Sequence, residues 1–246
     1  MARKAARPAR STRKAAASSS SPGATRAAPT SDRDKIIAAL FALLAEKPIE
    51  RIGLAEIAER AGVSLTELRG AFGSPLAIVA AHAKDTDRAV LAADLSDMAE
   101  EPPRERLFDV MMRRLELLAP DREAIRSLLR SAGRNPPLAL ALNALTVRSQ
   151  KWMLAAADIP ASGPRGALRA QGLALLYGSV LRTWVHDDDP GLARTMAALD
   201  RALGRGQRLA GILDDLCFIP SRLCRLRSRS RWRRRGDDEA EESAAA

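Results

Sequence analysis

Apolar residues recur every three or four positions along almost the whole of residues 31–219, which is the period of an amphipathic helix. The first such stretch, residues 32–46, places on one face Ile36, Ile37, Leu40, Phe41, Leu43 and Leu44. No segment alternates apolar and polar residues as a half-buried strand does. Ala, Leu, Arg and Glu, which favour helices, dominate the region. The pattern therefore predicts an all-α fold.

Prolines divide this region into separate elements, because a proline is tolerated at the start of a helix and disrupts its interior. The first helices are expected over residues 32–46 and 54–61, then from a cap at Ser64 to about Phe72. The later helices are expected at about 75–94, 104–118, 121–133, 137–157, 165–186, 190–204 and 206–219.

Residues 54–68 have the features of a helix-turn-helix. Gly62 follows the second helix, where a left-handed residue commonly ends a helix. Val63 fills the angle between the two helices, and Ser64 with Glu67 forms a capping box at the start of the next one. The N-terminal residues of such a third helix face base edges in a DNA major groove.

The stretch Ile-Ala-x-x-Ala-Gly-Val-Ser, from Ile57 to Ser64, resembles the TetR family of bacterial transcriptional regulators. The similarity in spacing covers residues 33–80. It implies a three-helix DNA-binding head, a helical body that binds a small ligand, and a homodimer. The function implied is that of a DNA-binding transcriptional regulator, a ligand-responsive repressor that acts on double-stranded DNA.

Four segments follow from this reading. Residues 1–30 are rich in Ala, Ser, Pro and Arg and are expected to form a disordered basic arm. Residues 31–80 are the TetR-type helix-turn-helix domain, and residues 81–219 are the ligand-binding and dimerisation domain. Residues 220–246 are an Arg-rich and then acidic tail that is expected to be disordered.

Four side chains of the third helix are candidates to contact DNA: Ser64, Thr66, Glu67 and Arg69. The head departs from the TetR pattern at three positions, with Arg69 in place of a Tyr, Pro75 in place of a phosphate-binding Lys and Gly53 in place of a capping Thr. Residues 31–75 also hold six basic and seven acidic groups. Since phosphate contacts supply much of the affinity for DNA, a helical hairpin that has lost its DNA contacts is the alternative.

The net charge of +10 is located in the terminal segments. Residues 1–30 carry seven basic groups and no acid, residues 222–235 carry eight arginines, and residues 237–242 carry five acids. Residues 31–221 are neutral, with 25 groups of each sign. Basic segments attract polyanions, so the tail could contact DNA phosphates or, after the apolar stripe over 206–219, an anionic membrane surface.

The body offers apolar candidates for a small-ligand pocket: Met111, Met112, Leu115, Trp152, Met153, Leu175 and Leu176. A plain core explains the same residues. The dimer contact is expected in helices 165–186 and 190–204, where Ala174 and Gly178 permit close approach.

A second stretch, with Tyr177, Trp184, Asp187-Asp188, Pro190, Thr195 and Leu199-Asp200-Arg201, resembles the lipid-binding proteins of ubiquinone biosynthesis, which share the TetR fold. This resemblance implies the alternative function, a lipid-binding accessory protein with a degenerate helix-turn-helix, and places Trp184 on a partner surface. Tyr177, Leu181 and Trp184 share one helix face, so they are candidates for a partner or dimer face and equally for the core.

Catalytic and metal-binding patterns are not evident, and neither an enzyme nor a cofactor is expected. His82 and His186 have no metal-ligand spacing, and no Gly-rich phosphate loop or nucleophile elbow occurs. The carboxylates of Asp187, Asp188 and Asp189 are expected to cap the next helix rather than bind an ion. The two cysteines, Cys217 and Cys224, imply no disulfide framework, so a cytoplasmic location is expected.

Overall fold

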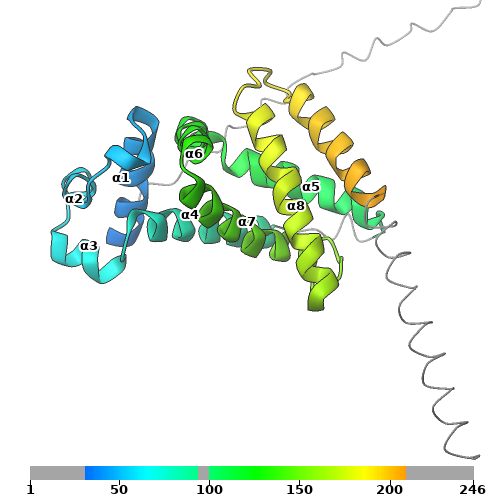
Figure 1. Cartoon of the computed structure of the whole chain (residues 1–246), viewed down its shortest axis with the longest axis horizontal. Coiled ribbons are helices and arrows are strands. Elements are labelled where there is room, and N and C mark those ends of the chain that lie inside the picture. The colour runs from blue at the N-terminus through cyan, green and yellow to red at the C-terminus, as the bar shows by residue number, and fades with distance from the viewer. Residues whose placement is uncertain (1–30, 94–99, 209–246) are drawn as a thin grey trace, which may run out of the picture.

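The computed structural model describes residues 31–93 and 100–208, and all regular secondary structure in these ranges is helical (Figure 1). The all-α prediction is therefore confirmed. The helices are α1 (Asp32–Glu46), η1 (Ile49–Arg51), α2 (Leu54–Ala61), α3 (Leu65–Ala71), α4 (Pro75–Leu91), α5 (Pro103–Leu117), η3 (Ala119–Asp121), α6 (Arg122–Arg134), α7 (Pro136–Ala156) and α8 (Gly163–Trp184), followed by a helix over residues 193–208. In this part of the chain, no helix is long and apolar enough to cross a membrane.

Serine side chains cap the starts of α1 and α4. The hydroxyl oxygens of Ser31 and Ser74 accept from the backbone N–H groups of Asp34 and Ala77, and α4 opens with Pro75 at its first position. A proline is tolerated there because that N–H has no partner within the helix. The predicted bounds of α1 and α2 are confirmed.

The prediction of two separate helices over residues 190–204 and 206–219 is wrong. One helix runs over residues 193–208, across Gly204 and Gly206. Glycine lowers helix propensity by only about 1 kcal/mol, so burial of Ala202 and Leu203 beside it offsets that cost. Residues 209–219 lie outside the described residues, as do the predicted basic arm, the Arg-rich tail and both cysteines.

The elements form a head and a body, joined by α4 (Figure 1). In the head, α1 packs its apolar face against α2, α3 and the start of α4, around a core that includes Leu40, Ile57 and Leu68. Two body residues on α6, Ala124 and Leu128, belong to the same core. The head therefore completes its core with a helix from the body.

The body has its own core between α5, α7, α8 and the helix over residues 193–208. Met111, Leu115, Met153 and Trp184 are completely buried there. Burying each such side chain contributes roughly 1.5–3 kcal/mol. This core positions α8 and the following helix side by side at the end of the molecule opposite α3 (Figure 1).

A buried polar cluster links four helices of the body. The guanidinium of Arg114 on α5 forms an ion pair with Asp87 on α4, and its Nε donates to the hydroxyl of Tyr177 on α8 at 3.3 Å. The hydroxyl of Ser149 on α7 donates to the same Asp87 oxygen at 2.7 Å. Burial raises the pKa of the Tyr177 phenol, which stays protonated.

Candidate nucleic-acid interface

The turn between α2 and α3 depends on one glycine. Gly62 has a φ of +66° in the left-handed region, and its N–H donates to the carbonyl of Glu59. The N–H of Val63 donates to the carbonyl of Ala58 at 3.0 Å, which closes the end of α2. The prediction of a left-handed cap at Gly62 is confirmed, and this cap sets the angle between the two helices.

The start of α3 is held by the predicted capping box. The hydroxyl oxygen of Ser64 accepts from the N–H of Glu67 at 3.2 Å, and the Glu67 carboxylate accepts from the N–H of Ser64 at 2.7 Å. The second of these bonds lowers the pKa of Glu67. Both side chains are thus engaged in holding the helix, so contact with a base would require them to give up these bonds.

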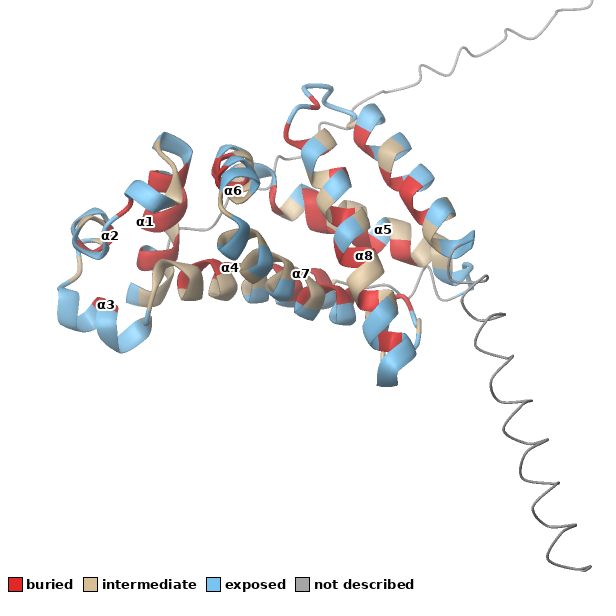
Figure 2. Ribbon diagram, in the orientation of Figure 1, coloured by how far each residue is buried: buried red, intermediate tan, exposed pale blue. Residues whose placement is uncertain are grey.

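The remaining candidates, Thr66 and Arg69, are exposed on α3, and within the described part of the chain neither side chain has a hydrogen bond or an ion pair. Leu68, between them, is 2% exposed and anchors α3 to the head core. Figure 2 shows α3 at the outer end of the head with most of its surface exposed. The helix is therefore fixed by one residue and presents the others to solvent.

An apolar side chain that the sequence reading left out lies at the same place. Leu65, the first residue of α3, is 55% exposed. A leucine at this position can contact the methyl group of thymine in a major groove. Leu65 lies three residues before the buried Leu68, and this spacing suggests that Leu65 is a core residue too. Only the structure shows that Leu65 is exposed.

Ion pairs engage most of the basic side chains of the head, which has one more acidic than basic group. Arg33 pairs with Asp85 at 2.7 Å and Lys35 with Asp32 at 2.7 Å. Lys47 pairs with Glu56, and Arg60 pairs with Glu46 at 2.8 Å. Of the six basic residues in 31–75, all of them described, this leaves Arg51 and Arg69 outside any salt bridge, and of these two Arg69 lies on α3.

The predicted ligand-pocket residues do not line one common cavity. Met111, Leu115 and Met153 are fully buried in the body core, and Met112 and Leu176 pack against it. Trp152 and Leu175 are 56% and 63% exposed. Successive residues of a helix are about 100° apart around its axis, so Trp152 and Leu175 cannot share a direction with Met153 and Leu176. Trp152 instead borders a groove between α4 and α7.

The predicted partner face lies mainly inside the chain. Tyr177 and Trp184 are 3% and 0% exposed, and the guanidinium of Arg122 lies 4.9 Å from the centre of the Trp184 ring. Leu181 is half-buried against the same core. Tyr177 and Trp184 are therefore core residues, and neither side chain is available to a partner. Ala174 is buried as well, and Gly178 is half-buried.

The aspartates after α8 hold the next helix. Asp187 accepts from the N–H of Thr195 at 2.8 Å and from its hydroxyl at 2.6 Å. Asp189 accepts from the N–H of Ala193 at 3.0 Å, at the point where the helix begins. The capping expected from the sequence is confirmed for Asp187 and Asp189, whereas the Asp188 carboxylate accepts no hydrogen bond within the described residues. Over the described ranges, no group of three or more His, Cys, Asp or Glu residues is placed to hold a metal ion.

No protein-family model and no curated protein sequence matches the chain. Solved structures do match it. The TetR transcriptional regulator from Nitrosomonas europaea ATCC 19718 is 22% identical, with a TM-score of 0.55 over 71% of this chain and 97% of that one. A TetR transcriptional regulator from Rhodococcus sp. RHA1 is 20% identical, with a TM-score of 0.52 over 71% and 95%. A TetR-family regulator from Syntrophomonas wolfei is 16% identical, with a TM-score of 0.51 over 73% and 94%. The capped helix-turn-helix and these similarities together show that the chain has the fold of the TetR-family transcriptional regulators.

Proposed function

We propose that the protein is a DNA-binding transcriptional regulator of the TetR type, in which α3 enters the major groove. The observation that carries the proposal is the construction of α3. Its start is held by the Ser64–Glu67 capping box, Leu68 anchors it, and Thr66 and Arg69 are left exposed and unpaired within the described part of the chain. Rigid placement of a few free side chains is what direct base readout requires.

Two such heads in a homodimer would read two half-sites about 34–36 Å apart. Exposed apolar residues on α8 and the following helix support this arrangement. Leu168 and Leu175 are 52% and 63% exposed and lie two turns apart on α8, and Met196 is 38% exposed on the neighbouring helix. Their burial against a second copy would remove them from water.

We propose further that the protein is a repressor and that it responds to a small ligand. Gln150 on α7 is completely buried, and neither its amide nitrogen nor its amide oxygen has a hydrogen-bond partner within the described residues. A buried amide without a partner costs about 1–3 kcal/mol. A ligand with a polar group that entered the body would offset this cost.

The test is binding to a fluorescent duplex from the protein's own upstream region, measured by anisotropy. Arg69→Ala should weaken binding about 10-fold or more, because a charged contact to a base or phosphate is lost. Arg194→Ala removes an exposed arginine at the far end of the body and serves as the matched control. Equal affinity in both variants would contradict the proposal.

A second arm separates the head from the basic terminal segments. A chain trimmed to residues 31–219 should retain sequence-specific binding, although binding to unrelated DNA should fall with the lost positive charge. If all affinity disappears on trimming, the terminal segments bind DNA and α3 does not.

A further inference from the structure

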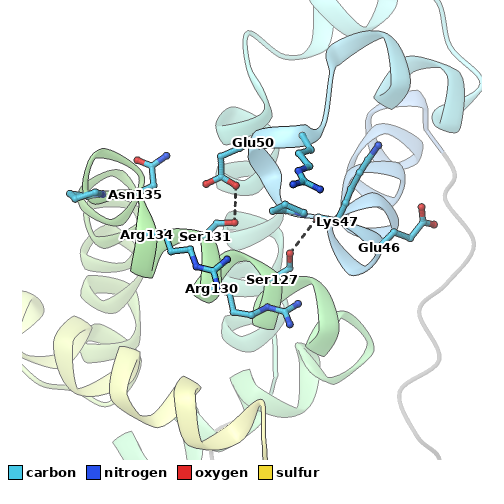
Figure 3. Close-up of a pocket in the computed structure, with 11 residues that line it drawn as sticks. Glu46, Lys47, Glu50, Ser127, Arg130, Ser131, Arg134 and Asn135 are labelled. Carbon is cyan, nitrogen blue, oxygen red and sulfur yellow. Dashed lines mark hydrogen bonds between the residues drawn. The ribbon is translucent and has the colours of Figure 1, made fainter.

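A polar groove lies between the head and the body, away from α3. It has a volume of about 670 Å³ and is lined by the end of α1, by η1 and by α6 (Figure 3). This volume lies within the range of about 300–1,000 Å³ that is usual for small-molecule sites. None of the residues predicted to bind DNA or an apolar ligand lines it.

The acidic groups in the groove are already engaged. The Ser131 hydroxyl donates to Glu50 at 2.9 Å, as the dashed line in Figure 3 shows, and Glu46 pairs with Arg60. A hydrogen bond from its own backbone N–H is the main cause that lowers the pKa of Glu50, with the Ser131 bond and the charge of Arg134 adding to it. Glu50 is therefore ionised at neutral pH and marks the acidic end of the groove.

Three arginines give the groove an excess of positive charge. Arg130 and Arg134 lie one turn apart on α6 (Figure 3). Arg51, on η1, lines the same groove. All three are exposed, and within the described ranges none of their guanidinium groups forms a salt bridge or a hydrogen bond. Lys47, also at the groove, is held by Glu56. Three free guanidinium groups thus line one half-enclosed space.

We propose that this groove binds an organic di- or triphosphate. A guanidinium presents paired N–H donors that match the oxygens of a phosphate, and three of them suit a ligand with several phosphates in a row. A single carboxylate would leave most of these donors unused. The volume leaves room for an organic group beside the phosphates. The site is independent of the proposed DNA-binding function.

The position of the groove gives the ligand a structural effect. Arg51 belongs to the head, whereas Arg130 and Arg134 belong to α6, which also supplies Ala124 and Leu128 to the head core. An anion bound to all three would hold η1 and α6 together. Because a ligand that binds only the folded state stabilises it, the melting temperature should rise with ligand concentration.

The test is isothermal titration calorimetry of the full chain with ATP, and separately with inorganic tripolyphosphate. The double variant Arg130→Ala/Arg134→Ala should bind ATP at least about 10-fold more weakly, since two charge-assisted contacts are lost. Arg201→Ala/Arg205→Ala is the matched control, because it removes two exposed arginines at the same spacing from the helix over residues 193–208. The control should bind as the original chain does.

Equal affinity of the two double variants would overturn the proposal and place binding elsewhere, for example in the Arg-rich residues 222–235. Tripolyphosphate that binds as tightly as ATP would show that the groove takes the phosphate chain alone and would overturn the organic part of the assignment.

Glu50→Gln provides a test that loss of folding cannot imitate. The amide oxygen of Gln can still accept from Ser131, whereas the negative charge facing the ligand is removed. ATP affinity should therefore increase, by about 3-fold or more at low salt. Unchanged or weaker binding in this variant, with an unaltered circular dichroism spectrum, would overturn the proposal even if the double arginine variant failed to fold.

Discussion

Gly62 and Gly70 are two glycines of the helix-turn-helix in opposite backbone conformations. Gly62 has a φ of +66°, and Gly70 lies within α3; a Cβ would meet no atom within 4 Å at either position. Gly62→Ala should destabilise the chain by about 1–2 kcal/mol, because an L-residue is strained in the left-handed region. Gly70→Ala should stabilise it by about 0.5–1 kcal/mol. Urea denaturation measures both, and effects of the same sign would contradict this account.

Asp187 is a residue whose effect depends on pH. The hydrogen bond from the Thr195 hydroxyl is the main cause of its lowered pKa, so the folded state favours the carboxylate. Its contribution to stability is therefore present above the unfolded pKa, near about 4, and is lost as the pH falls through the folded value. Asp187→Asn should be less stable than the original chain at pH 7, and the difference should shrink on acidification. Denaturant melts at several pH values would show a constant difference if this is wrong.

Local residue roles followed directly from the sequence, because caps and turns involve neighbours. Gly62, the Ser64–Glu67 pair and the capping aspartates were all predicted and confirmed. Glu67 was predicted both to contact DNA and to form the capping box. In the structure its carboxylate is engaged in the cap, where it accepts from the N–H of Ser64. The exposure of Leu65 depends on how α3 packs against α1, and the local sequence pattern does not determine that packing.

Helix positions were predicted from proline and apolar spacing, whereas contacts between helices were not. Asp87, Arg114 and Ser149 are residue types that are usually exposed, and no sequence pattern joins them to one another or to Tyr177 across four helices. The predicted pocket and partner residues were chosen from helix faces for the same reason. Tyr177 and Trp184 face the core because the helix over residues 193–208 covers them together with α5 and α7.

The Arg114–Asp87 pair should behave as a unit that fastens α4 to α5. Arg114→Met should cost about 3–5 kcal/mol, because the buried carboxylate of Asp87 is left without its counter-charge. Asp87→Asn combined with Arg114→Met should cost clearly less than the sum of the two single variants. A double-mutant cycle by urea denaturation measures the difference, and simple additivity would show that the pair is not coupled.

At the scale of the whole molecule, α8 carries the apolar surface expected of a homodimer contact. Leu175→Glu should shift the protein from dimer to monomer, because a charge would be buried at the contact. Leu140→Glu is the matched control, since Leu140 is 71% exposed on α7. Light scattering after size-exclusion chromatography gives the mass. A monomer in both variants, or in the original chain, would contradict the expected dimer.

The participation of Ala124 and Leu128 in the head core limits how this protein can be taken apart. A gene fragment that ends after α4 encodes α3 intact and still lacks the apolar surface that α1 packs against on α6. The head is therefore not expected to fold when it is transferred alone to another protein. A chimaera that borrows it would have to take α6 from the same parent, and mutations in α6 would be inherited together with compensating changes in α1.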